Sequence, residues 1–107
     1  MKSLTVIYKI LKLLEKNMGK EDFDYKSISA DAMKVSYEQW EQLLIMMFDE
    51  GFIKGIVVAN AVEDKFRHIA EPIRPEITIK GIEYLSENSA MKKAGKALQM
   101  IGWVYPK

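Results

Sequence analysis

Seven polar and basic side chains in the middle of the chain have the chemistry of nucleic-acid recognition. Glutamine amides can form paired hydrogen bonds with adenine edges, whereas Lys, Arg and His side chains can neutralise backbone phosphates. The glutamines fall in an expected helix, and the basic residues fall in the hairpin expected to follow it. The candidates are Gln39, Gln42, Lys54, Lys65, Arg67, His68 and Arg74. These residue types make double-stranded DNA one candidate partner.

The expected helix that carries the two glutamines is acidic, and this opposes phosphate binding. Residues 35–53 contain four carboxylates and no Lys or Arg, which gives a local charge of −4. The four are Glu38, Glu41, Asp49 and Glu50. This acidic face is either solvated or turned towards a protein partner. The basic residues around Phe66 can instead bring the tip of the hairpin into contact with a line of backbone phosphates. Three acidic residues nearby lower the net positive charge of this basic patch.

Other kinds of chemistry find little support in the residues. The chain has no Cys and a single His, so it offers no thiolate nucleophile and no His pair for a transition metal. It also lacks the GxSxG, P-loop and GxGxxG motifs. We expect His68 to be a surface or hairpin-packing residue, because its neighbours in sequence offer it no partner. We therefore expect no enzyme, no catalytic residue, no metal, no cofactor and no small-molecule ligand.

The length and composition fit one small globular domain. The chain has 107 residues, of which 49% are hydrophobic, and this balance excludes a disordered chain. Its net charge is +1, so no overall field attracts nucleic acid or a membrane. Lys9, Lys12 and Lys16 interrupt the apolar N-terminal run, and no stretch approaches the about 18 apolar residues of a membrane span. We expect a cytoplasmic protein without a membrane partner.

Helical periodicity predicts three helices in the first half of the chain. The first covers residues 4–18, and its apolar face is wide enough to be buried on two sides or to pack against a partner chain. A short second helix is predicted within residues 20–36, anchored by Phe23, Ile28, Ala32 and Met33, with a turn near Lys34 and Val35. Ser36 and Gln39 are typical of a capping box that opens the third helix, which Gly51 ends. The core stripe of this third helix is Trp40, Leu43, Leu44, Met47 and Phe48.

The helical spacing of apolar residues ends at Gly51. Residues 52–58 are rich in Ile, Val and Phe, which predicts a strand, and a second strand at 76–79 would pair back on it. The segment between them is predicted to be a hairpin or extended loop. Thr78 can cap a fourth helix, and Ser89 can cap a last amphipathic helix with lysines off its apolar stripe.

This order of elements predicts an α+β winged helix-turn-helix, with three helices, a β-hairpin wing and additional C-terminal helices. We assign residues 1–88 to the winged-helix domain. Residues 89–107 form the expected C-terminal amphipathic helix, packed either on the domain or on a partner subunit. A homodimer through terminal helices is therefore one expected assembly.

Three short motifs carry a resemblance to a known family. They are Gln39-Trp40, Glu50-Gly51-Phe52-Ile53 and Thr78-Ile79-Lys80-Gly81 followed by Tyr84-Leu85. With these motifs, residues 4–104 resemble the YjcQ family of small winged-helix proteins from Gram-positive bacteria and their prophages. The resemblance implies the winged-helix fold and a phage or prophage origin. It brings no catalytic or ligand-binding residues with it.

Two functions follow as alternatives. The first is a DNA-binding or transcription-regulator-like protein whose contact is led by the basic wing. The second is a protein interaction or assembly module that uses the acidic third helix. A basic patch around the wing favours the first, whereas an exposed apolar patch that includes Ile45 and Met46 favours the second.

Overall fold

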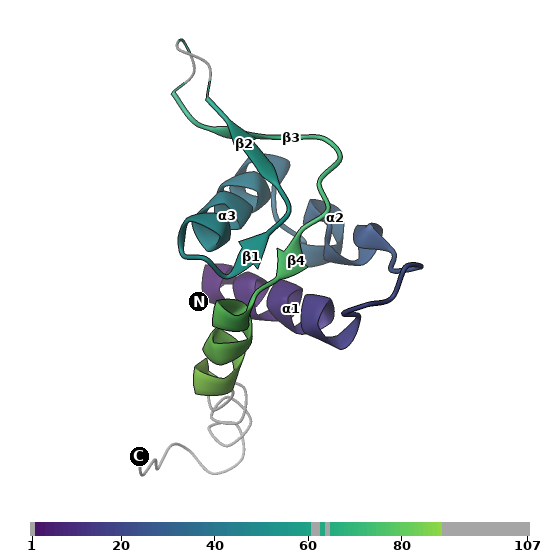
Figure 1. Cartoon of the computed structure of the whole chain (residues 1–107). Coiled ribbons are helices and arrows are strands. Elements are labelled where there is room, and N and C mark those ends of the chain that lie inside the picture. The colour runs from purple at the N-terminus through teal and green to yellow at the C-terminus, as the bar shows by residue number, and fades with distance from the viewer. Residues whose placement is uncertain (1, 61–62, 64, 89–107) are drawn as a thin grey trace.

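The computed structural model describes residues 2–60, 63 and 65–88, and within them the chain is an α+β protein. The elements are α1 (Lys2–Lys16), η1 (Tyr25–Ile28), α2 (Ala30–Met33), α3 (Tyr37–Asp49), β1 (Ile53–Lys54), β2 (Val57–Ala59), β3 (His68–Ala70) and β4 (Glu76–Ile77). A further helix runs through residues 79–88. In Figure 1, β2 and β3 extend away from the helices at one end of the molecule, and the 79–88 helix lies at the opposite end. The last predicted helix, 89–107, and its contact with a partner subunit fall outside the described residues.

The α2–α3 unit has the local signals that its sequence predicts. Ser29 and Ser36 cap the two helices, and the Ser36 hydroxyl accepts a hydrogen bond from the Gln39 backbone N–H at 3.1 Å. Between them Lys34 adopts a left-handed conformation with φ 61°. The second half of the predicted capping box, in which the Gln39 side-chain oxygen would accept from the Ser36 backbone N–H, is not formed. Gln39 Nε2 instead donates to the Ser3 hydroxyl at 3.4 Å.

Gly51 ends α3 as predicted. Its φ is +83°, and its N–H donates to the Phe48 carbonyl, while the next N–H, of Phe52, donates to Met47. This pair of hydrogen bonds is the Schellman arrangement, which needs a residue that tolerates positive φ. The chain therefore reverses at Gly51 and enters β1 directly.

The single strand predicted at 52–58 is two strands. Gly55, at φ +87°, breaks the run, and a Cβ there would lie 3.2 Å from the Arg74 carbonyl oxygen. β1 pairs antiparallel with β4, with Ile53 opposite Ile77. β2 pairs antiparallel with β3, with Val58 opposite Ile69. The return strand was predicted correctly at its start, but β4 ends at Ile77 and the sequence signals did not identify β3.

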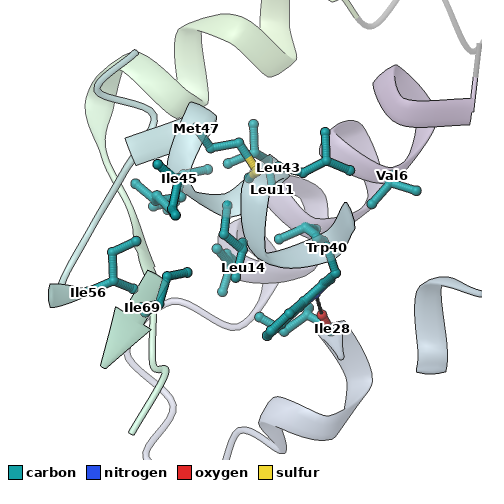
Figure 2. Packing of buried hydrophobic residues seen from close by; sticks show 14 of the residues in the cluster. Val6, Leu11, Leu14, Ile28, Trp40, Leu43, Ile45, Met47, Ile56 and Ile69 are labelled. Carbon is teal, nitrogen blue, oxygen red and sulfur yellow. Dashed lines mark hydrogen bonds between the residues drawn. The ribbon is translucent and has the colours of Figure 1, made fainter. Parts of the chain in front are cut away.

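The core lies between α1, α3 and the strands (Figure 2). Trp40 is buried there, and its indole N–H donates to the Ile28 carbonyl at 2.8 Å, so this contact links α3 to η1. One prediction for α3 is wrong, because Phe48, expected in the core stripe, is 36% exposed. Ile45, which an exposed apolar patch on this helix would have included, is 1% exposed. The buried face of α3 therefore includes Ile45, and β3 packs against this helix.

The wide apolar face of α1 is used within the chain. Its buried residues are Val6, Ile10, Leu11 and Leu14. Beyond β4, Thr78 caps the 79–88 helix as predicted, because its hydroxyl accepts from the Gly81 N–H at 3.1 Å. That hydroxyl also donates to the Gly51 carbonyl, which joins the start of this helix to the end of α3.

Candidate nucleic-acid interface

The β2–β3 hairpin lies across α3 and then projects beyond it (Figure 1). Along β3 only the middle residue, Ile69, is buried, and its two neighbours are exposed. Along β2 no residue is fully buried. A hairpin with so little apolar burial needs other contacts to stay on the helix.

Glu41 supplies the first of these contacts. Its carboxylate is buried, with the residue 5% exposed, and Oε2 accepts from the Ile69 backbone N–H at 2.8 Å. The other oxygen, Oε1, lies 3.0 Å from His68 Nδ1. Burying a carboxylate is costly unless hydrogen bonds replace its water. Both oxygens of Glu41 have such a partner in β3, so this side chain ties the hairpin to α3.

Arg67 and Asp49 supply the second contact. The guanidinium Nη1 lies 3.2 Å from Asp49 Oδ1, and Nη2 lies 2.5 Å from Oδ2, which is a two-pronged ion pair. These hydrogen bonds hold the pKa of the Asp49 carboxyl below its ordinary value, and they raise the pKa of Arg67. Both side chains remain more than two-fifths exposed, so solvent screens the pair.

The predicted acidic face of α3 is therefore divided between two environments. Glu41 and Asp49 face the chain's own hairpin, which corrects the expectation that this face is solvated or meets a protein partner. Glu38 and Glu50 are exposed to solvent. Next to Glu41, the pKa of Tyr37 is raised, first by its partial burial and then by the negative charges of Glu41 and Glu71.

The two glutamines of α3 are both engaged within the chain. Gln42 Nε2 donates to the Arg67 carbonyl oxygen at 2.9 Å, which adds a third contact between α3 and the hairpin. Gln39 points towards α1, where it meets Ser3. The structure thus directs these amides to different neighbours and does not gather them on one surface.

The basic candidates fall into two groups. Lys65, Arg67 and His68 belong to the hairpin, whereas Lys54 lies on β1 and Arg74 lies just before β4. The ammonium of Lys65 lies 5.7 Å from the centre of the Phe66 ring, and the Arg74 guanidinium lies 5.8 Å from that of Tyr25. Lys54, Lys65 and Arg74 form no ion pair with any described residue.

His68 has a partner that its neighbours in sequence do not reveal, because Glu41 lies 27 positions earlier. The contacts of Glu41 and Asp49 with the hairpin were likewise not predicted from the sequence. The available signal was the opposite charge of two adjacent segments, the acidic helix and the basic hairpin. Which carboxylate meets which base depends on how the hairpin crosses α3.

Within the described ranges, no cluster of three His, Asp or Glu side chains is arranged to hold a metal ion. No helix in this part of the chain is long and apolar enough to cross a membrane. One cleft of about 450 Å³ lies between the end of α1 and β4, and its rim carries Lys20, Glu21, Lys54 and Glu76. Charges of both signs on this rim favour no particular ligand.

The fold and the site together define a class: a small α+β protein whose antiparallel hairpin is fixed on a helix by charged side chains. A family model described as YjcQ protein matches residues 8–102, and the chain belongs to this family. The match confirms the resemblance inferred from the motifs around Trp40, Gly51 and Gly81. No curated protein and no solved structure matches the chain.

Proposed function

We propose that this protein is a cytoplasmic winged-helix DNA-binding protein whose β2–β3 hairpin acts as the wing. In this proposal α2, the turn at Lys34 and α3 form the helix-turn-helix. The observation that carries the proposal is the burial of Glu41 against β3, where its hydrogen bonds hold the basic hairpin on α3. One of the four carboxylates that would oppose phosphate is thereby satisfied inside the chain, and a second, Asp49, is paired with Arg67.

The hairpin offers the charge and shape that such a contact requires. It projects beyond α3 (Figure 1), and Lys65, Phe66 and Arg67 are exposed at its end. Lysine and arginine supply phosphate contacts that do not depend on base sequence. An exposed aromatic ring between them can pack against sugars or enter a minor groove. The proposal therefore places the first contact with DNA at the hairpin.

The glutamines have a secondary role in this proposal. Phosphate contacts leave the hydrogen bonds of Gln39 and Gln42 intact. Sequence recognition by either amide requires it to exchange its present partner for a base edge. We therefore expect binding with weak sequence preference. Weak sequence preference fits a DNA-binding protein, which is the role we propose. We include a transcription-regulator-like role and a phage or prophage origin in the same proposal, of which only the origin is implied by the resemblance.

The test is fluorescence anisotropy of labelled duplex DNA over a salt series. A double variant, Lys65→Gln with Arg74→Gln, removes two unpaired charges of the candidate interface. Its matched control, Lys16→Gln with Lys20→Gln, removes two exposed charges near the end of α1. Each lost phosphate contact reduces the slope of log affinity against log salt by about 0.9. We expect a reduction of about 1 to 2 in the first variant and little change in the control.

Two outcomes contradict the proposal. Absence of binding at low salt by the folded protein rejects DNA as the partner. Equal losses in the two double variants show that net charge, and not the candidate interface, governs binding.

A protein interaction module is the second candidate function. Met46 is 53% exposed on α3, which also carries the exposed acid Glu38 and ends at the exposed acid Glu50. Ile45, the second residue that such an apolar patch would include, is buried, so the exposed apolar surface is limited to Met46 at this point of the helix. Two results together support this candidate. The protein fails to bind DNA, and it binds a defined protein partner in a way that Met46→Lys abolishes.

A further inference from the structure

Arg67 is the cation of the hairpin whose binding edge is already occupied. Its two terminal nitrogens both reach Asp49, at 3.2 and 2.5 Å. A guanidinium presents the same two-pronged edge to a carboxylate and to a phosphate. A phosphate that approaches this edge therefore meets the Asp49 carboxylate in the place it would take.

The Arg67 side chain can leave Asp49 without lifting the hairpin from α3. The hairpin keeps its buried Ile69 side chain and the hydrogen bond from the Ile69 N–H to Glu41. Gln42 binds the backbone carbonyl of Arg67, so that contact also survives a change in the side chain. Because both members of the Arg67–Asp49 pair are exposed, water can solvate each of them when they separate.

We infer that Asp49 is an internal competitor for Arg67, which lowers the affinity of the hairpin for nucleic-acid phosphate. This inference rests on the proposed DNA-binding function and adds a residue that regulates it. Asp49 acts against binding in two ways. It occupies the guanidinium before DNA arrives, and it leaves an unpaired carboxylate near the phosphate once DNA has displaced it.

The experiment compares two variants that change the charge by the same amount. Asp49→Asn removes the competing charge, whereas Glu50→Gln removes the charge of the next residue, which pairs with no described cation. Affinity for one labelled duplex is measured at fixed salt for the full chain. We expect Asp49→Asn to bind about three to ten times more tightly than the unchanged protein. Glu50→Gln should gain about twofold at most, through net charge alone.

A second comparison assigns the gain to Arg67. In an Arg67→Gln background the Asp49→Asn change should give only the small gain of Glu50→Gln, because the cation that Asp49 occupies is gone. Thermal denaturation of each variant verifies that the fold is retained. Asparagine keeps the shape of the side chain, so this position tolerates the change at the end of α3.

The outcomes separate the inference from the function beneath it. Equal gains in Asp49→Asn and Glu50→Gln overturn the competition and leave DNA binding in place. Weaker binding by Asp49→Asn also overturns it, since Asp49 would then be holding Arg67 in position for phosphate. Failure of both the unchanged protein and Asp49→Asn to bind DNA rejects the proposed function and this inference together.

Discussion

The two small sheets of this protein both contact α3, but they are held in place by different forces. In the β1–β4 pair, the facing residues Ile53 and Ile77 are both buried in the core. In the β2–β3 pair only Ile69 is buried, while Val57, on the partner strand, is 65% exposed. Glu41 and Asp49 supply the remaining attachment through hydrogen bonds and charge. Apolar burial thus holds one sheet and polar contacts to α3 hold the other.

This difference suits the two sheets to different tasks. Apolar burial resists solvent and makes the β1–β4 sheet part of the cooperative core. A few polar contacts, by contrast, fix the hairpin while its basic side chains stay in water. Segments with few buried apolar contacts open at a lower free energy than the core. Substitutions in the two sheets should therefore differ in their effects on global stability and on local opening.

Ile53→Ala should have the largest effect, because Ile53 is 2% exposed in the β1–β4 sheet. Deleting most of a buried Ile side chain costs about 2 to 5 kcal/mol. Chemical denaturation measures the loss. Val57→Ala, in the exposed β2 strand, is the matched control and should change stability by at most about 0.5 kcal/mol. Similar losses at the two positions would contradict the contrast between the sheets.

Gly81→Ala tests how closely the 79–88 helix packs on the β1 end of the core. An added Cβ would lie 2.4 Å from the Phe52 carbonyl oxygen and 2.7 Å from the Ile77 side chain. The backbone must shift to relieve this overlap, at a cost of about 3 kcal/mol. Thermal denaturation reports it, with exposed Lys80→Ala as the control in the same helix. An unchanged melting temperature would show that this helix moves freely relative to Phe52.

Glu41→Ala should loosen the hairpin while the core persists. It leaves the Ile69 N–H without its acceptor, and a buried donor without a partner costs about 1 to 3 kcal/mol. Hydrogen exchange should accelerate at Ile69 and much less at Ile77. Glu41→Gln keeps an oxygen acceptor and should protect Ile69 better than alanine does. Equal exchange at Ile69 in all three proteins would show that Glu41 does not hold the hairpin.

Asp49→Asn should give the smallest change in stability, and the size of this change should depend on pH. Its pKa is lowered by Arg67, so its stabilising contribution is present above the unfolded-state value of about 4. The contribution is lost as the pH falls through the lower folded-state value. Melting temperatures of the unchanged protein and Asp49→Asn should therefore converge below about pH 4. A constant difference from pH 6 to 3 would exclude this titration as its source.

Several features of the fold were predictable because their signals are local. The Ser36 cap, the Gly51 turn and the Thr78 cap each involve hydrogen bonds that span a few residues. The core position of Trp40 follows from helical periodicity, and burial confirms it. Such contacts are largely determined by which residues stand three or four positions apart.

Other features depend on contacts between distant segments. The break at Gly55 places that residue against the carbonyl of Arg74. In the sequence, apolar residues stand on both sides of Lys54 and Gly55, so residues 52–58 resemble one strand. On α3, Ile45 is buried and Phe48 is exposed. Which of the two is buried depends on the side of the helix on which the hairpin packs. An apolar stripe at helical spacing predicts one buried face of a helix. When a second element, here the hairpin, packs beside that face, the buried face becomes wider, and periodicity does not indicate on which side.

The candidate site shows the same division. The acidic helix, the basic hairpin and the caps between them follow from local sequence. The contacts of Glu41 with His68 and the Ile69 N–H, and of Asp49 with Arg67, arise only when the chain is folded. The physical reason is distance along the chain. Partners 18 to 28 residues apart meet only where the docked hairpin crosses the helix, and that crossing is set by the packing of the whole core.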